Sequence, residues 1–171
     1  MDSSDLLTDG FVRIQQAVTS VLEGLTSEQA AHRLDREANP IAWLVWHLTR
    51  VQDDHVAELA GREQEWITGE WNLRFGTSPE PSNTGYGHTS EQVAEVVPDS
   101  VATLGLYHDA VFACTRDYLA GIDEIELERI IDRSYDPPVS AGVRLVSVIN
   151  DSMQHAGQAL YVRGIVDRAA M

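Results

Sequence analysis

The chain has 171 residues, of which 43% are hydrophobic and 23% are charged. This length and composition predict one globular domain with a hydrophobic core over residues 1–171, because two independent domains would each be small. Its 27 acidic residues outnumber 12 basic ones, and the formal net charge of -15 argues against nucleic acids and anionic membranes as partners.

The first predicted helix covers residues 4–25, SDLLTDGFVRIQQAVTSVLEGL. Its apolar residues recur three or four positions apart, which places them on one face of an amphipathic helix. These residues are Leu7, Phe11, Ile14, Val18, Val21 and Leu25. A short helical piece, TSEQAAHRL, is expected to follow, with Thr26 or Ser27 as its N-cap.

The second long helix is predicted over residues 40–60. Asn39 is a good N-cap, Pro40 suits the first helical turn, and Gly61 ends the helix. Residues 62–97 differ, because glycine and proline recur there and the aromatic residues follow no firm period. A connection of this length indicates either a functional loop or a crossover that packs over the end of a bundle.

The third long helix is predicted to begin at Asp99 or Ser100 and to end at Gly121. A second irregular segment follows, with a short strand or turn expected around Ile130 and Ile131. The last helix is predicted from near Ser140 to residue 168. Four long helices without a run of alternating strands predict an all-α bundle.

The sequence also indicates a compartment and excludes some chemistry. No stretch approaches the ~20 uncharged apolar residues of a membrane-spanning helix, and the N-terminal MDSSDLLTDG is acidic where a signal peptide is basic. We therefore expect a cytoplasmic protein.

The single cysteine, Cys114, excludes an internal disulfide and is expected to be a buried core thiol rather than a nucleophile. All the basic residues are arginine, so no lysine can form a Schiff base.

Asp151 and His155 lie four positions apart in the last predicted helix, so their side chains project from adjacent turns of one face. His47, flanked by tryptophan and leucine in the second long helix, is a third donor that is expected to face inward. Two histidines and one carboxylate suit catalytic zinc with an open coordination position, and they suit non-haem iron as well. Spacing alone still favours the other interpretation, in which a buried histidine and an aspartate satisfy each other.

Three further residues are candidates for substrate binding. Arg50 and Asp54 lie on the same helical face as His47 and carry charged groups that can bind a polar group of a substrate. Arg144 lies two turns before Asp151, and its guanidinium group suits bidentate hydrogen bonding to a substrate carboxylate. An ordinary ion pair is the alternative for each.

The remaining histidines are weaker candidates. His55 is a poor co-ligand for His47. It lies eight residues further along the helix, so its side chain projects in a different direction around the helix axis. His88 and Tyr86 belong to a glycine-rich loop that either covers the site or packs on the bundle. His108 is expected to form a hydrogen bond with Asp109 or with another helix. His32 is expected to face solvent.

The segments WLVWHLTRVQDDH, TGYGHT, YHDAV and DPPVSAGVRLVSVINDSMQHAGQ resemble the DinB-like superfamily, in particular its actinobacterial branch near the mycothiol-dependent maleylpyruvate isomerases and thiol S-transferases. The likeness covers about residues 35–165, and the histidine followed by alanine, glycine and glutamine is its most specific element. The resemblance implies a four-helix bundle with an up-down-down-up course and long crossovers.

The resemblance also implies a divalent ion held by His47, Asp151 and His155, with zinc as the first choice and nickel or iron as alternatives. Many relatives have histidine where this chain has Asp151, although the maleylpyruvate isomerases have a carboxylate there. The implied function is S-transfer or isomerisation with a low-molecular-weight thiol such as mycothiol and a small electrophile, in a monomer or homodimer. The alternative is a non-catalytic DinB-like protein, for metal binding or stress response, with a structural or degenerate site.

Overall fold

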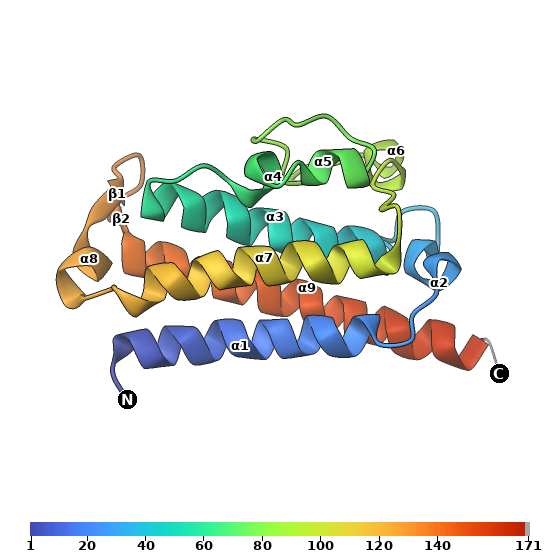
Figure 1. Ribbon diagram of the computed structural model, residues 1–171, viewed down its shortest axis with the longest axis horizontal. Coiled ribbons are helices and arrows are strands. Elements are labelled where there is room, and N and C mark those ends of the chain that lie inside the picture. Colours follow the sequence, from blue (N-terminus) through green and yellow to red (C-terminus); the bar gives the residue numbers. More distant parts are fainter. Residues whose placement is uncertain (170–171) are drawn as a thin grey trace.

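The computed structural model describes residues 1–169, and four long helices run side by side through this part of the chain (Figure 1). They are α1 (Ser3–Leu22), α3 (Ile41–Ala60), α7 (Val101–Ala120) and α9 (Ala141–Ala169). Helices α1 and α9 run in one direction and α3 and α7 in the other, while α3 and α1 each contact both α7 and α9. This arrangement confirms the predicted all-α bundle with its up-down-down-up course.

The helix ends follow local capping rules. Asp2 caps α1 in a reciprocal capping box with Asp5, and Thr26 does the same for α2 (Ser27–Ala31). Helix α3 begins one residue later than predicted: Pro40 rather than Asn39 is the N-cap, because its backbone is extended and its carbonyl already accepts from Leu44. The end of α3 is as predicted, with Gly61 in the left-handed conformation.

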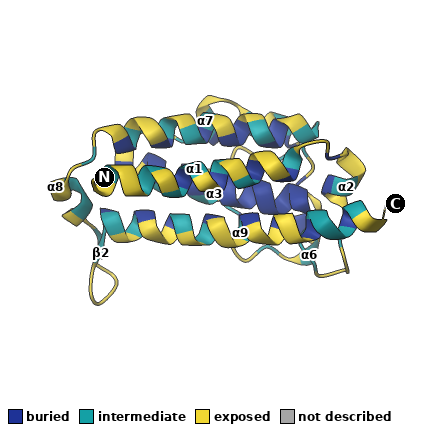
Figure 2. Ribbon diagram, turned by 90° about the horizontal axis from the view of Figure 1, so that it is seen from below, coloured by how far each residue is buried: buried dark blue, intermediate teal, exposed yellow. Residues whose placement is uncertain are grey.

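Helix α3 is the most deeply buried of the long helices, and every residue from 41 to 50 is buried. The crossover over residues 61–100 covers the side of α3 that faces away from the bundle (Figure 1). Figure 2 shows the result, with α3 almost entirely buried behind α1, α7 and α9, whose outer faces are exposed. The charged face that an amphipathic helix normally presents to solvent is therefore missing from the first half of α3.

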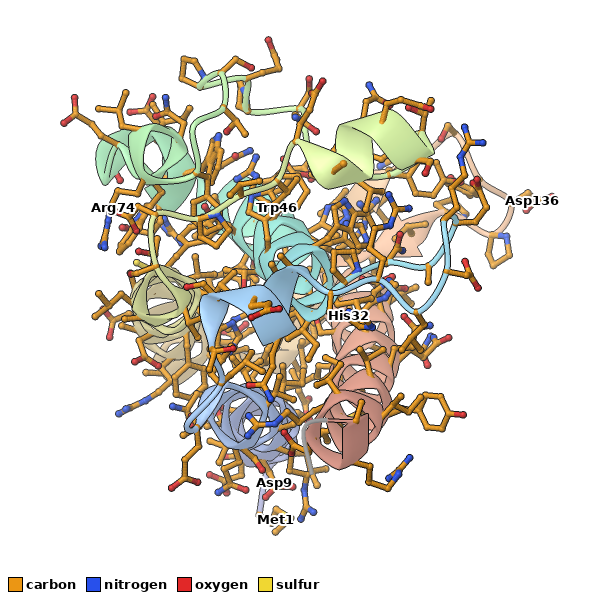
Figure 3. The ribbon with its side chains drawn as sticks, turned by 90° about the vertical axis from the view of Figure 1, so that its right-hand side faces the viewer. Met1, Asp9, His32, Trp46, Arg74 and Asp136 are labelled. Carbon is orange, nitrogen blue, oxygen red and sulfur yellow. The ribbon has the colours of Figure 1, made fainter. Side chains whose placement is uncertain are left out.

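The crossover is more regular than its composition predicts. It contains α4 (Glu65–Thr68), α5 (Trp71–Arg74) and α6 (Ser90–Ala94), and it lies along α3 rather than over the end of the bundle. Trp66 and Phe75 are each 1% exposed, and Trp66 packs edge-on against Trp46 of α3. Figure 3 shows Trp46 on the side of α3 that the crossover covers. Burial of these rings holds the segment, since its helices are too short to be stable alone.

The connection between α7 and α9 contains α8 (Glu124–Glu128) and a two-stranded antiparallel sheet. Strand β1 (Ile130–Asp132) pairs with β2 (Val139–Ser140), which confirms the short strand expected around Ile130. Strand β2 leads directly into α9. None of the described helices has the length and apolar character needed to cross a bilayer.

Candidate metal centre

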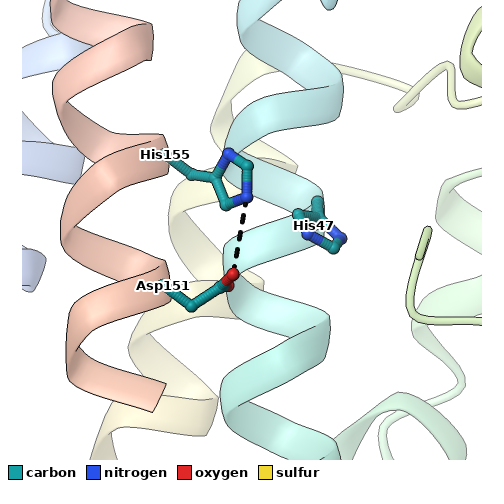
Figure 4. Close-up of side chains that lie close together, drawn as sticks. All are labelled: His47, Asp151 and His155. Atoms are coloured by element: carbon teal, nitrogen blue, oxygen red, sulfur yellow. Dashed lines mark ion pairs between the residues drawn. The ribbon is translucent and has the colours of Figure 1, made fainter. Parts of the chain in front are cut away.

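His47, Asp151 and His155 converge between α3 and α9, two antiparallel helices that pack closely along the bundle (Figure 4). Each residue offers one ligand atom, and these atoms all lie within 4.8 Å of one another. His155 Nε2 is 3.7 Å from Asp151 Oδ1. The tertiary structure thus joins the pair on α9 to the donor on α3.

Hydrogen bonds leave one ring nitrogen of each histidine free for the centre. His47 Nδ1 is 2.5 Å from the carbonyl oxygen of Thr84, which can only accept, so Nδ1 carries the proton and Nε2 keeps its lone pair. His155 Nδ1 donates to Gln158 Oε1 over 2.8 Å, and its Nε2 faces Asp151. Such outer partners orient histidine ligands in metal sites.

The environment of His47 favours its neutral form. The side chain is 5% exposed and stacks on Trp43, with ring centroids 4.6 Å apart. Desolvation by burial lowers the pKa of His47 below its usual value, and this effect outweighs the hydrogen bond to Thr84, which raises it. A neutral imidazole is the form that binds metals.

The three residues fit a divalent ion. Tetrahedral zinc with bonds of ~2.1 Å needs ligand atoms about 3.4 Å apart, which is close to the 3.7 Å between Asp151 and His155. Asp151 Oδ2 is buried and has no hydrogen-bond partner within the described part of the chain. A buried carboxylate oxygen without a partner is costly, and a cation beside it would remove that cost.

A glycine-rich loop supplies the Thr84 carbonyl. Gly85 has a φ of +92°, and a Cβ there would lie 2.8 Å from the Trp46 ring and 2.9 Å from His47 Nδ1. Only glycine lets the backbone approach α3 this closely. The two glycines of TGYG were the signal in the sequence, but this role of Gly85 was not predicted from it.

The loop packs on the bundle, which is one of the two alternatives raised for it, and its Thr84 carbonyl also reaches the site. Trp43 Nε1 donates to His88 Nδ1 over 3.2 Å, and His88 Nε2 lies 2.7 Å from Asn83 Oδ1. These contacts fix the loop on α3. Tyr86, at the tip of the loop, is 92% exposed and stands at the rim of a cleft.

This cleft of about 480 Å³ opens beside the three ligands. It is lined by His47, Val51, Asp54, His55, Thr84, Tyr86, Ser147, Val148, Asn150 and Asp151. Two of the three candidate ligands therefore form part of its wall. The cleft gives a small molecule access to a centre that is otherwise enclosed by α3 and α9.

The sequence profile of the mycothiol-S-transferase family matches residues 7–168, nearly the whole chain. The chain belongs to this family. It is also similar to a conserved protein from Enterococcus faecalis whose crystal structure is known, with 31% sequence identity and a TM-score of 0.88 over 95% of this chain and 96% of that one. No protein with a curated description matches. The resemblance to DinB-like proteins near the mycothiol-dependent enzymes is thereby confirmed.

In this mycothiol-S-transferase family member, Arg50 does not face the cleft as the sequence suggested. Its side chain is fully buried and lies over the Trp66 ring, where solutes have no access. Its donors are taken by the carbonyl oxygens of Pro81 and Asn83, Gln64 Oε1 and Tyr107 Oη. An ion pair with Asp53 at 3.5 Å completes the set, so Arg50 anchors the crossover.

The other two candidates for substrate binding have different positions. Asp54 lines the cleft while accepting from Gln64 Nε2 over 2.7 Å. Arg144 is not among the lining residues: its Nη1 is 3.0 Å from His55 Nδ1 and its Nη2 is 3.8 Å from Asp132. His55, a poor co-ligand by its position on the helix, is half-buried in the cleft wall, where Arg144 contacts it.

The remaining polar candidates lie away from the cleft. His108 is 1% exposed and contacts Thr49 Oγ1 of α3 over 3.2 Å, as expected for a histidine that bonds another helix, and His32 is exposed. Cys114 is half-buried rather than fully buried. It lies at the margin of the buried face of α7, where its thiol donates to Glu65. Desolvation raises the pKa of Cys114 to about 11, so it is a poor nucleophile.

Proposed function

We propose that this chain is a divalent-metal-dependent thiol S-transferase that uses mycothiol or a similar low-molecular-weight thiol. The observation that carries the proposal is the convergence of His47, Asp151 and His155 beside the cleft, with the first two in its wall, in a chain of the mycothiol-S-transferase family. We take the ion to be zinc, with nickel or iron as alternatives, because this donor set suits each of them. We place the reaction in the cytoplasm, where such thiols are kept reduced.

When bound, the ion supplies a Lewis acid that lowers the pKa of a thiol from its free value near ~8.5. The protein contributes orientation and shielding from water. Thr84 and Gln158 fix the two imidazoles, and the Trp43 ring covers one face of His47. The open side of the centre is the cleft, where the thiol and its electrophile meet.

The lining of the cleft favours a thiol rich in hydroxyl groups over one with carboxylates. Ser147 and Asn150 offer donors and acceptors, while the carboxylate of Asp54 repels an anion. Among the described residues, no arginine lines this cleft. Mycothiol carries its thiol on an acetylated cysteine joined to a sugar and an inositol, and it has no carboxylate. Its chemistry therefore matches this lining.

The bonds that change belong to the two small molecules. The thiol loses its proton to solvent through the open cleft, its sulfur forms a bond to a carbon of the electrophile, and a leaving group departs. In an isomerase no leaving group departs: the sulfur adds to one carbon of an activated double bond, the resulting single bond rotates, and the sulfur then leaves the same carbon as the double bond re-forms. The side chains of this chain are not consumed, which agrees with the poor nucleophilicity of Cys114.

The alternative function is that of a non-catalytic DinB-like protein, for binding or stress response. The 3.7 Å separation of Asp151 and His155 favours it, since the pair can satisfy each other without an ion. Metal content separates the proposal from a degenerate site that holds no ion, whereas activity separates it from a structural metal site. Less than about a tenth of an equivalent of transition metal in protein purified without a histidine tag, even after reconstitution, would contradict the proposal.

Activity is the second test, with the loaded protein, mycothiol and monochlorobimane, whose chloride is the leaving group. Asp151→Asn keeps the size of the side chain but removes its charge, and we expect it to lose both the metal and the reaction. Asp117→Asn is the matched control, since Asp117 is exposed on α7. A rate equal in wild type and Asp151→Asn would refute S-transfer while leaving metal binding to the elemental analysis.

A further inference from the structure

His55 forms part of the cleft wall at a distance from the candidate ligands. It is eight residues beyond His47 on α3, which places it about 12 Å away along the helix axis. Both residues line the cleft, and the His55 side chain is 28% exposed. The cleft therefore runs from its ligand end, where His47 and Asp151 lie, to a histidine that the proposed reaction does not use.

Arg144 determines which ring nitrogen of His55 carries the hydrogen. Arg144 Nη1 is 3.0 Å from His55 Nδ1 and 3.5 Å from Nε2, and a guanidinium group can only donate. The shorter contact makes Nδ1 the acceptor, so the hydrogen is on Nε2. Asp54 Oδ2 is 3.6 Å from Nδ1, which is too far to hold a hydrogen there.

The ring of His55 is neutral near pH 7. Burial lowers the pKa of His55 below its usual value, and the positive charge of Arg144 lowers it further. These two effects outweigh the nearby acids that raise the pKa, which are Asp54, Glu58 and Asp151. A neutral imidazole with its hydrogen on Nε2 is a hydrogen-bond donor, and it can stabilise a developing negative charge without losing its proton.

The hairpin that precedes α9 holds Arg144 in turn. Arg144 Nη2 is 3.8 Å from Asp132 Oδ2 of β1, and the Arg144 side chain is only 20% exposed. The guanidinium group thus lies between His55 on α3 and Asp132 on the hairpin, which limits the rotation of both side chains that it contacts. The donor on His55 is therefore held in place before a substrate binds, as an effective catalytic donor must be.

We infer that His55 donates an Nε2 hydrogen bond to the atom that leaves carbon when the thiol attacks, and that it thereby favours electrophiles whose leaving atom is oxygen, such as epoxides. This inference rests on the proposed S-transfer. A sulfur at the ligand end attacks carbon from that side, so the breaking bond points along the cleft toward His55. Sulfur, carbon, oxygen and the hydrogen bond to a donor together span about 8 Å, which fits within the cleft.

The chemistry explains the preference for oxygen. When an epoxide reacts, the sulfur–carbon bond forms as the carbon–oxygen bond breaks, and the electron pair of the broken bond stays on the oxygen. This oxygen then takes a proton from water, which balances the proton that the thiol lost, and His55 stays neutral. An alkoxide oxygen concentrates its charge and accepts a strong hydrogen bond, whereas chloride disperses its charge over a larger atom.

Long-range ¹H–¹⁵N correlation spectra of the metal-free protein at pH 7.5 test the donor without any reaction. We expect the His55 ring to carry its hydrogen on Nε2, with its signals identified by their loss in His55→Gln. Arg144→Met should convert this state into a mixture of both tautomers, with an unchanged circular dichroism spectrum. A hydrogen on Nδ1 in the wild type would overturn the inference.

Styrene oxide and benzyl chloride test the preference, because they share a phenyl ring and differ in the leaving atom. His55→Phe keeps a ring but removes the donor. With metal-loaded protein and mycothiol, it should lower the ratio of kcat/KM for styrene oxide to that for benzyl chloride by at least about tenfold. His55→Gln retains an N–H donor and should restore part of the ratio, while His32→Phe, at an exposed position, should match the wild type.

The ratio separates this inference from the proposed function. Both electrophiles use the same thiol and the same centre, so a general loss of structure or metal lowers both rates and leaves the ratio unchanged. An unchanged ratio in His55→Phe overturns the role of His55 and leaves S-transfer standing. A wild-type protein that transfers sulfur to neither electrophile overturns both.

Discussion

His47 donates its Nδ1–H to the Thr84 carbonyl oxygen over 2.5 Å, and this bond determines which ring nitrogen faces the candidate metal centre. The acceptor is a backbone atom of a loop that is separated from His47 by almost forty residues. The orientation of a candidate ligand on α3 thus depends on how the crossover packs. Metal affinity should therefore respond to changes in the loop as well as to changes in the ligands.

Gly85→Ala should weaken metal binding by about 10- to 100-fold, the usual effect of losing an outer partner of a ligand. The new Cβ would lie 2.8 Å from Trp46 and 2.9 Å from His47 Nδ1, so the loop must move away and take the Thr84 carbonyl with it. Titration with zinc against a competing chelator measures the affinity.

Gly87→Ala is the control for Gly85→Ala, because Gly87 also has a positive φ, +73°, but a Cβ there meets open space. Its backbone strain of about 1–2 kcal/mol should lower stability without a large change in affinity. Equal losses of affinity in the two variants would show that loop strain, and not the contact with His47, controls the centre.

Gln158→Leu should also lower metal affinity, by a similar factor of about 10 to 100. The amide oxygen of Gln158 accepts from His155 Nδ1 over 2.8 Å, and leucine leaves this imidazole free to rotate and to change tautomer. Gln154→Leu on the same helix is the matched control, since Gln154 bonds only the carbonyl oxygen of Asn150. An affinity in Gln158→Leu equal to that of Gln154→Leu would exclude an orienting role.

Arg50→Met should lower the free energy of unfolding by about 3–5 kcal/mol, measured by urea denaturation of the metal-free protein. The substitution leaves Asp53 as a buried carboxylate without its cation and frees the carbonyl oxygens of Pro81 and Asn83. Arg116→Met, at an exposed position of α7, should have little effect. A loss below about 1 kcal/mol would contradict the anchoring role of Arg50.

Acid should destabilise the protein through His108. Burial lowers the pKa of His108 to about 4 from 6.5, so in the intervening pH range the unfolded chain binds a proton that the folded chain does not. The contribution of neutral His108 to the free energy of unfolding is fully present above pH ~6.5 and is lost as the pH falls toward ~4. At pH 4.5 the loss is about 2–3 kcal/mol.

The measurement for His108 is the urea midpoint of the metal-free protein at pH 7.5 and 4.5, in wild type and His108→Gln. The variant removes the titrating group, so its loss of stability on acidification should be smaller by that amount. His32→Gln, at an exposed site, should behave as wild type. An identical loss in wild type and His108→Gln would refute this assignment.

The sequence by itself determined the helices and the main donors of the site. Apolar residues three and four positions apart, together with caps such as Thr26 and Gly61, specify helices through contacts within a few residues, so they can be predicted locally. The spacing of Asp151 and His155 fixed their common face in the same way. The tryptophan and leucine neighbours of His47 indicated a third inward-facing donor, and the resemblance to DinB-like proteins implied that the three residues hold an ion.

Only the tertiary structure decided what these residues contact. Arg50 lies on the helix of His47, yet it binds the crossover, because that segment covers α3 and leaves no solvent on that side. The Thr84 carbonyl, like any backbone oxygen, has no signature in the sequence, so its bond to His47 appears only when the loop is packed. Helical spacing fixes the direction of side chains along one helix, whereas their partners from distant segments depend on packing, which buries polar groups such as Arg50 and brings distant donors together.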